Sequence, residues 1–252
     1  MAVTQEYLSL QGSSHLAKIV DGKPVAMREL GNQTSVQLKI STETFPINET
    51  KTGKRGTIKT VTKSRDIELE LKLDEQKRED IALAFQAEPL KTAGRTVTDE
   101  VLPTLKIGDD AKLEGFNLSQ LTITDSTPST PKTLVLDTDY SVDLQAGMVK
   151  LLKTDGITQP LKASYTEGDI ESNVFFTLPD GAEYRYLFKG INSLDNKRVM
   201  VELWKFQPVV DSTLDLINDE LGELSIKGKA NLDNDKSQDP KLGAFGRIVY
   251  LD

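Results

Sequence analysis

The sequence predicts a mainly β protein, built as two packed antiparallel sheets with one flanking α-helix and an inserted β subdomain. Three observations support this prediction. Apolar and polar residues alternate with a period of two along much of the chain, one segment has a strong helical pattern, and the middle of the chain is more acidic than its flanks. The 252 residues, of which 37% are hydrophobic, are enough to bury a sizeable core.

The clearest strand covers residues 66–73. One face carries apolar side chains and the other carries charged ones, as a half-buried strand requires. The apolar side chains are Ile67, Leu69, Leu71 and Leu73, and the charged ones are Glu68, Glu70 and Lys72.

Further strands are predicted by the same alternation. Residues 35–40 alternate cleanly, whereas residues 198–206 are apolar on both faces and should lie inside a sandwich or between subunits. Turn residues between the runs, at Gly31-Asn32, Ala146-Gly147 and Pro179-Asp180-Gly181, favour antiparallel hairpins. Shorter strand-like runs cover residues 23–30, 56–62, 140–152, 173–178, 184–191, 222–230 and 246–251.

Helix is expected in two places. Residues 74–87 combine good helix formers with Asp74 as an N-cap, and Ile81, Ala84 and Phe85 form a stripe that can dock on a sheet. A second, short helix is predicted over residues 212–218, where Asp211 or Ser212 can cap.

A long loop is predicted over residues 41–55, between two strands. Loops of more than about 12 residues in a compact domain are commonly functional or disordered. Residues 51–65 hold six basic residues and no acid, in a chain whose formal charge is −8. Two interpretations remain open: the basic run docks on an acidic neighbouring surface, or it is a solvated loop and strand face.

The middle of the chain is predicted to be an insert. Residues 91–172 hold 8 basic and 13 acidic residues, whereas residues 1–90 hold 13 of each. We therefore expect one β-sandwich domain from residues 1–103 and 173–252, and an inserted β subdomain over residues 104–172.

Several classes of chemistry find no support in the sequence. The chain has no cysteine and one histidine, His15, so we expect no thiolate metal site, no cysteine nucleophile and no histidine cluster. Asp137, Asp139 and Asp143 superficially resemble a calcium loop but lack its glycine and its final Glu. No phosphate-binding or G-x-S-x-G motif is present. We expect no enzyme activity, no metal and no cofactor.

Charge and hydropathy also argue against two kinds of partner. The acidic balance disfavours wrapping nucleic acid, and no stretch approaches about 18 consecutive apolar residues, so we expect no membrane span. The N-terminal residues lack the pattern of a secretory signal.

Beyond these patterns, the chain resembles the major tail tube protein of long-tailed bacteriophages from about Leu30 to Asp252. The N-terminal part of the resemblance is the order VQLKI, long loop, IELELKL and DEQKREDIALAF. The C-terminal part is YRYLFKGINSLDNKRVMVELWKFQPVVDSTLDLINDELGELSIKGKANLD followed by FGRIVYLD. The middle segments LTITD, DTDYSVDLQAGMVKLL and LKASYTEGD are similar to a stretch common in siphophage tail proteins.

The resemblance implies a tail-tube β-sandwich of two roughly orthogonal sheets that assembles as stacked hexameric rings around a channel for ejected DNA. The implied partners are other copies, tail terminator and baseplate or initiator proteins, and a sheath if the tail is contractile. Tape-measure protein and DNA would pass through the lumen without specific binding. The implied location is the virion tail, assembled in the bacterial host cytoplasm.

The resemblance also implies roles for particular residues. The long loop would reach the adjacent ring, and its candidate contact residues are Thr44, Phe45, Asn48, Lys51, Lys54 and Arg55. Acidic side chains on inner strands would make a negative lumen to which DNA does not stick. The candidate lumen-facing acids are Glu68, Glu70 and Glu202.

Two alternative functions remain. The first is a non-enzymatic β-sandwich binding module of the baseplate or adhesin type that contacts a host surface or glycan. The second is a hydrolase on a β scaffold that would use clustered carboxylates such as Asp137, Asp139 and Asp143. A tube subunit should self-associate, whereas a binding module should stay small.

Overall fold

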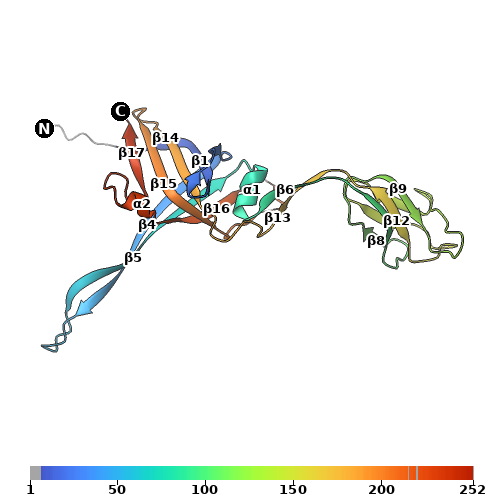
Figure 1. Ribbon diagram of the computed structural model, residues 1–252, viewed down its shortest axis with the longest axis horizontal. Helices are drawn as coiled ribbons and strands as arrows, with labels where there is room; N and C mark the ends of the chain where they lie inside the picture. Colours follow the sequence, from blue (N-terminus) through green and yellow to red (C-terminus); the bar gives the residue numbers. More distant parts are fainter. Residues whose placement is uncertain (1–6, 215, 220, 252) are drawn as a thin grey trace. The chain divides into compact units, whose positions relative to one another are not determined.

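The computed structural model describes residues 7–214, 216–219 and 221–251 and confirms a mainly β fold with packed antiparallel sheets. The chain divides into two compact units (Figure 1). The main unit comprises Met1–Pro89 and Asn173–Asp252, and the inserted unit comprises Leu90–Ser172. The N-terminal residues 1–6, on which the expectation of no secretory signal rests, lie outside the described residues.

The main unit is built on one nine-stranded sheet with the order β2-β1-β14-β15-β16-β5-β4, to which β3 and β17 add by pairing with β1 and β15. All its pairings are antiparallel. The strands are β1 (Leu10–Val20), β2 (Lys23–Pro24), β3 (Arg28–Glu29), β4 (Gln33–Asn48), β5 (Thr57–Leu73), β14 (Tyr184–Asn192), β15 (Arg198–Val209), β16 (Leu224–Asn231) and β17 (Gly246–Leu251).

Strand β15 divides this sheet into two halves. Its first part pairs with β17 as far as Leu203, and its last part pairs with β16 from Lys205 onward. The first half is β1, β14, β15 and β17, and the second half is β15, β16, β5 and β4. Their inner faces share one core, which includes Leu16, Tyr186, Phe188, Leu203 and Phe206 from the first half and β15, and Leu69, Leu71, Leu73, Leu224 and Ile226 from the second.

Strand β15 is apolar on both faces because residues of the same chain cover each face. The register shifts opposite Leu203 and Phe206, so both side chains face the core, as a β-bulge allows. Trp204 is buried on the other face, where its indole N–H donates to the Gly243 carbonyl at 2.9 Å. No neighbouring subunit is needed to cover Trp204.

The predicted helix is present but shorter, as α1 (Arg78–Ala84). Lys77 occupies the N-cap position without a side-chain cap, so the prediction of Asp74 as N-cap was wrong. The reason is that Asp74 and Glu75 hold another segment: Asn32 donates its side-chain amide to Asp74 at 2.7 Å and its backbone N–H to Glu75 at 2.9 Å. Leu83 and Ala84 place the helix on the core.

Two other local predictions were wrong. Gly31 and Asn32 do not form a hairpin, because β3 pairs with β1 while β4 pairs with β5. No helix forms in the described residues of segment 212–218; residue 215 lies outside them. A four-residue helix, α2 (Asn234–Ser237), follows β16 instead, capped by Asp233.

Two turn predictions were confirmed. Ala146 and Gly147 lie in the hairpin between β10 and β11, where Asp143 pairs with Met148. In the turn at residues 179–181, the Ala182 N–H donates to the Pro179 carbonyl at 3.1 Å.

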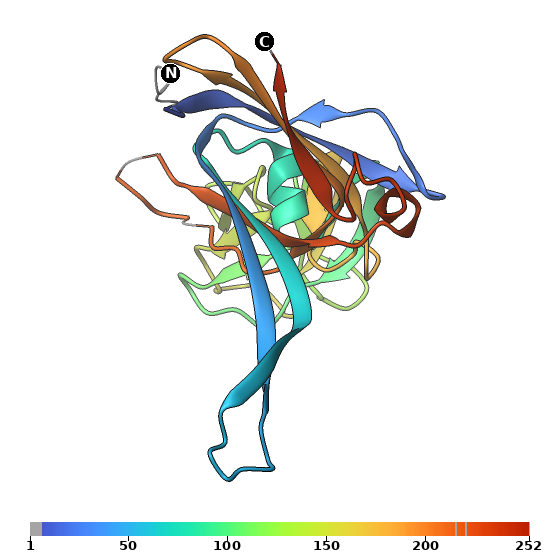
Figure 2. The ribbon, with the colours of Figure 1, turned by 90° about the vertical axis from the view of Figure 1, so that its left-hand side faces the viewer.

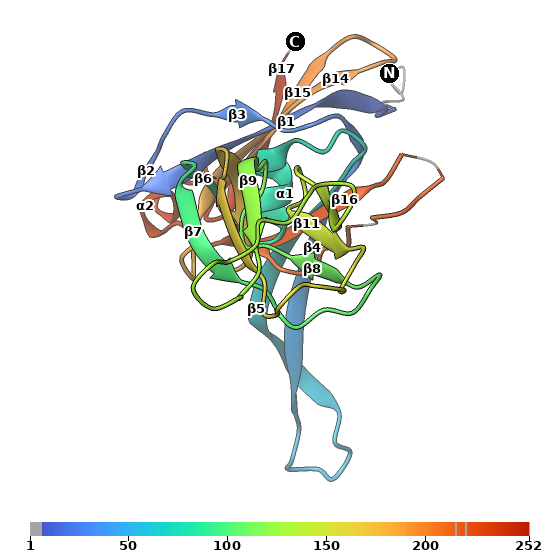
Figure 3. The same ribbon diagram turned by 90° about the vertical axis from the view of Figure 1, so that its right-hand side faces the viewer.

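The inserted unit has two three-stranded sheets, β10-β11-β8 and β7-β12-β9, and its own core (Figure 3). It starts before the predicted residue 104, because β7 pairs with β12. A two-stranded pair, β6 and β13, lies at its ends. The strands are β6 (Glu88–Thr92), β7 (Thr96–Val101), β8 (Asp110–Lys112), β9 (Ser119–Thr124), β10 (Tyr140–Asp143), β11 (Met148–Leu151), β12 (Lys162–Thr166) and β13 (Ile170–Val174).

Candidate assembly surface

The predicted long loop at residues 41–55 is mostly a β-hairpin. Strands β4 and β5 stay paired out to Asn48 and Thr57, so only residues 49–56 form the connection. The paired residues 42–65 project from the sheet as an arm (Figure 2). The strands contain 16 and 17 residues, well beyond the usual length of about 5–6. A loop was predicted because the arm has no buried face and therefore no clear apolar alternation.

The tip of the arm has a defined turn. The Glu49 carboxylate accepts hydrogen bonds from the backbone N–H and the hydroxyl of Thr52, at 2.5 and 2.6 Å. These bonds, with the hydroxyl bond foremost, lower the pKa of Glu49 despite an opposing desolvation. Gly53 adopts a φ of 74°, which glycine allows at little cost. The turn presents Lys51, Lys54 and Arg55 to solvent.

All six residues predicted for this contact lie on the arm and are exposed. Thr44, Phe45 and Asn48 belong to β4, and Lys51, Lys54 and Arg55 belong to the tip. Within the described residues, the only ion pair of the arm joins Lys63 to Glu43 at 2.7 Å.

The arm combines unpaired charge with exposed apolar side chains. Phe45, Ile47 and Ile58 are exposed on it. Five arm cations form no ion pair with any described residue, namely Lys51, Lys54, Arg55, Lys59 and Arg65. An exposed, partly apolar hairpin of this kind is typical of a segment that binds a partner.

Two edges of the main sheet are also open. Among the described residues, β4 pairs only with β5 and β17 only with β15. Between these edges lies an open cleft of about 480 Å³, lined in part by Leu38, Phe188 and Val201. Ile248 of β17 also lines this cleft, and Ile248 and Tyr250 are both exposed. Unpaired backbone groups next to apolar side chains can accept a neighbouring strand.

Glu68 and Glu70 share the outward face of β5, as predicted. Glu68 lies 3.0 Å from Lys39 and 3.8 Å from Lys229, and Glu70 lies 3.9 Å from Lys227. The hydrogen bond from Lys39 is the main reason why the pKa of Glu68 is lowered. Each acid is therefore balanced by lysines from neighbouring strands, and this face has mixed charge rather than the purely negative charge expected.

Glu202 lies elsewhere, on the outward face of the first half of the sheet. Arg185 and Arg247 each donate to its carboxylate at 2.7 Å. The Arg185 guanidinium stacks 4.1 Å from the centre of the Trp204 ring. Burial alone would raise the pKa of Glu202, but the two arginine hydrogen bonds outweigh it and lower the pKa. The structure thus groups Glu68 with Glu70 but not with Glu202.

The three aspartates considered for metal binding or hydrolysis serve local turns. Asp139 is buried and accepts from the Val135 N–H at 2.9 Å. Asp143 accepts from the N–H groups of Gln145 and Ala146 in the β10–β11 turn. Asp137 has a positive φ of 60°, and its backbone N–H donates to the Tyr140 carbonyl at 2.7 Å, so it also belongs to a turn. Over residues 7–214, 216–219 and 221–251, no group of three or more acidic or histidine side chains could hold a metal ion.

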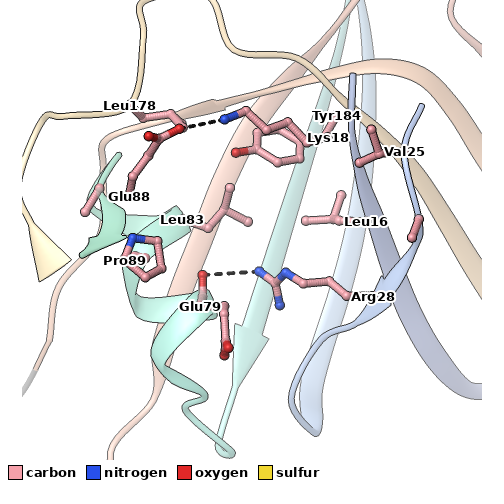
Figure 4. Close-up of a pocket in the computed structure, with 13 residues that line it drawn as sticks. Leu16, Lys18, Val25, Arg28, Glu79, Leu83, Glu88, Pro89, Leu178 and Tyr184 are labelled. Atoms are coloured by element: carbon pink, nitrogen blue, oxygen red, sulfur yellow. Dashed lines mark hydrogen bonds and ion pairs between the residues drawn. The ribbon is translucent and has the colours of Figure 1, made fainter. Parts of the chain in front are cut away.

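A pocket of about 390 Å³ lies between α1 and β1 (Figure 4). Leu16, Leu83 and Tyr184 give it apolar walls. Both of its cations have partners: Lys18 donates to Glu88 at 2.6 Å, and Arg28 binds the backbone carbonyl of Glu79 and the carboxylate of the buried Asp80. The hydrogen bond to Glu88 raises the pKa of Lys18. These pairs tie the helix to the sheet, so we assign the pocket a structural role.

The structure is thus a two-unit β protein with an exposed basic arm and, among the described residues, open sheet edges at β4 and β17. A comparison with known protein families matches residues 7–249 to the family described as "Protein of unknown function UCP028589". The chain belongs to that family. A comparison with curated proteins finds no match. Within the described part of the chain, no helix is long and apolar enough to cross a membrane.

Proposed function

We propose that this chain is a structural, non-enzymatic subunit that assembles into stacked rings and forms the tail tube of a bacteriophage. The observation that carries the proposal is the arm of residues 42–65. It holds five cations without an ion pair in the described structure and three exposed apolar side chains. A bound partner would pair these charges and bury these side chains. In the tube, the arm contacts the adjacent ring.

The open edges supply the second contact, within a ring. Strand β4 of one copy and β17 of a neighbour each have an unpaired side in the described residues. A closed ring of copies would pair these edges and cover Ile248 and Tyr250, which removes the aggregation risk of an open sheet. The resemblance to tail tube proteins suggests six copies per ring.

The outward face of β5 is our candidate for the lumen wall. Glu68 and Glu70 there neutralise neighbouring lysines, so DNA phosphates would find no uncompensated cations to bind. DNA and tape-measure protein would then pass without sticking. Glu202, which lies on the other half of the sheet, is no longer part of this lumen proposal.

The remaining assignments follow from the tube proposal. The subunit would be located in the virion tail after assembly in the host cytoplasm. Terminator and baseplate or initiator proteins would bind the two ends of the tube, and a sheath would surround it in a contractile tail.

Electron microscopy of the purified protein tests the proposal directly. Negative-stain images at high protein concentration should show hollow tubes or rings, and light scattering on the same sample should give a mass many times the 27.9 kDa of one chain. A particle that stays monomeric at every concentration, with or without preformed tube ends as seeds, would contradict it.

One observation favours the binding module as a second candidate. The inserted unit has its own core, and Val135 and Leu136 are exposed in the segment that precedes β10. If the full chain stays monomeric but binds host cell surfaces or glycans, and mutation of Val135 and Leu136 to Ser abolishes that binding, this candidate replaces the tube.

A further inference from the structure

The segment between β15 and β16, residues 210–223, exposes more large apolar surface than a short loop normally does. Leu216, Ile217 and Leu221 are 86%, 95% and 82% exposed. Single exposed apolar residues are ordinary, but three in one short segment indicate an interaction site. We call this segment the acidic loop, because it also contains five acids and no base, namely Asp211, Asp215, Asp219, Glu220 and Glu223.

The ends of the acidic loop are firmly attached to the main unit. Lys227 binds Asp211 at 2.8 Å, and Lys72 binds Glu223 at 3.4 Å. Gln76 donates to the Gly222 carbonyl at 2.6 Å. Asp219, in contrast, forms no ion pair with a described residue. The ends of the loop are therefore fixed to the main unit, whereas the side chains of Leu216, Ile217 and Leu221 between them are exposed to solvent.

The arm and the acidic loop are complementary in composition. The arm, residues 42–65, contains six basic and two acidic residues, a net charge of 6 − 2 = +4. The acidic loop has a net charge of −5. Both segments also expose large apolar side chains: Phe45, Ile47 and Ile58 on the arm, and Leu216, Ile217 and Leu221 on the loop.

These two segments lie at opposite ends of β5. Lys72, near the C-terminal end of β5, holds the acidic loop, whereas the arm begins at Arg65 and runs toward the N-terminal end. At about 3.3 Å per residue, the strand separates the two by roughly 20 Å before the arm extends further away. The arm therefore points away from the loop of its own chain. Complementary surfaces at opposite ends of a subunit favour head-to-tail contacts, which either close into a ring or continue as a filament.

We propose that the arm of one copy docks on the acidic loop of a second copy. The apolar side chains of the two segments pack together, and cations of the arm pair with Asp219, the described loop acid that forms no ion pair within its own chain. This inference rests on the self-assembly proposed above and adds the identity of the surface that receives the arm.

Cysteine cross-linking tests the contact without background, because the chain has no cysteine of its own. One variant carries Arg55→Cys and another carries Ile217→Cys, both at exposed positions. When the two are mixed and assembled, mild oxidation with copper phenanthroline should join them in a band of 2 × 27.9 kDa, about 56 kDa. We expect at least ten times more of this product than from either variant alone.

The matched control replaces Ile217→Cys with Leu194→Cys, an exposed residue that is not in either segment. If images show tubes but the Arg55→Cys and Ile217→Cys pair cross-links no better than this control, the docking inference is wrong and the tube proposal stands. If no polymer forms, the tube proposal itself fails.

Charge exchange provides an independent test. Asp219→Lys should reduce the polymer mass at least several-fold, and so should Lys54→Glu with Arg55→Glu. A chain carrying all three changes should recover much of the assembly, because the charges are exchanged across the contact. Asp180→Lys, the same change in the exposed turn at residues 179–181, is the control and should assemble normally. Normal assembly of Asp219→Lys would overturn the inference.

Discussion

The two parts of strand β5 follow one backbone but differ in what surrounds them. At the base, residues 67–73, the strand lies between β4 and β16, and Leu69, Leu71 and Leu73 are buried. In the arm, residues 57–65, it pairs with β4 alone and most side chains are exposed. The base is stabilised by burial in the chain's own core, whereas the described residues of the arm are held by the hydrogen bonds of its ladder, a few side-chain hydrogen bonds such as those of Glu49, and one ion pair.

If the arm binds a second copy as proposed, this difference separates the two roles of one strand: its base stabilises the fold and its arm makes the contact. A buried leucine contributes about 1.5–3 kcal/mol through burial. An isolated two-stranded hairpin is marginally stable at best in water. Changes at the base should therefore alter the free energy of unfolding, and changes in the arm should alter association.

The largest expected effect on stability is at the base. Leu71→Ala removes a fully buried side chain and should lower the free energy of unfolding by about 2–5 kcal/mol. Urea denaturation followed by circular dichroism measures this change. Ile58→Ala, the matched change in the arm, should stay within about 0.5 kcal/mol. Equal losses for the two variants would remove the distinction between base and arm.

A smaller loss of stability is expected at Glu202, which is held on the outward face of the sheet by ion pairs with Arg185 and Arg247. Glu202→Gln should cost about 1–3 kcal/mol at pH 7, because it weakens the hydrogen bonds from Arg185 and Arg247. The pKa of Glu202 is lowered in the folded state, so its contribution is complete above the ordinary value of 4.5 and is lost as the pH falls through the folded value.

The test is a pair of urea titrations across a pH series. The difference between wild type and Glu202→Gln should be largest near pH 7 and should shrink as the pH falls below 4.5. A difference that stays constant from pH 7 to pH 3 would show that the carboxylate charge is not what stabilises this face.

The smallest effect on stability is expected from removing the arm. Replacing residues 44–63 with Asn-Gly joins Glu43 to Ser64, which already pair, through a favourable two-residue turn. The free energy of unfolding should change by less than about 1 kcal/mol. The polymer mass measured by light scattering should nevertheless fall to that of single subunits or single rings. Normal tubes from this variant would exclude the arm from assembly.

How much the sequence predicts depends on how much of each segment is buried. Residues 66–73 were predicted as a strand because burial on one face imposes alternation, and β5 confirms it. Most side chains of the arm are exposed on both faces of the hairpin, so its sequence shows no alternation of apolar and polar residues. For that reason the segment was predicted as a loop. The end of the inserted unit was placed at Ser172, but its start was missed because the pairing of β7 with β12 is distant in sequence.

The candidate site was predicted less completely than the fold. The basic residues of the arm were identified from charge alone, and they are exposed there. The lysines beside Glu68 and Glu70 come from β4 and β16, so no local pattern could reveal them. The exposed residues of the acidic loop were missed because residues 212–218 were predicted to form a short helix, for which Asp211 or Ser212 could provide the cap.

Hydrogen exchange at two protein concentrations tests the central claim most directly. In dilute solution, amides of the base should be protected and those of the arm should exchange quickly. In a concentrated sample, in which light scattering detects polymer, the arm amides should become protected at least tenfold while the base changes little. Arm amides that exchange equally fast in both samples would contradict the proposal that the arm binds a second copy.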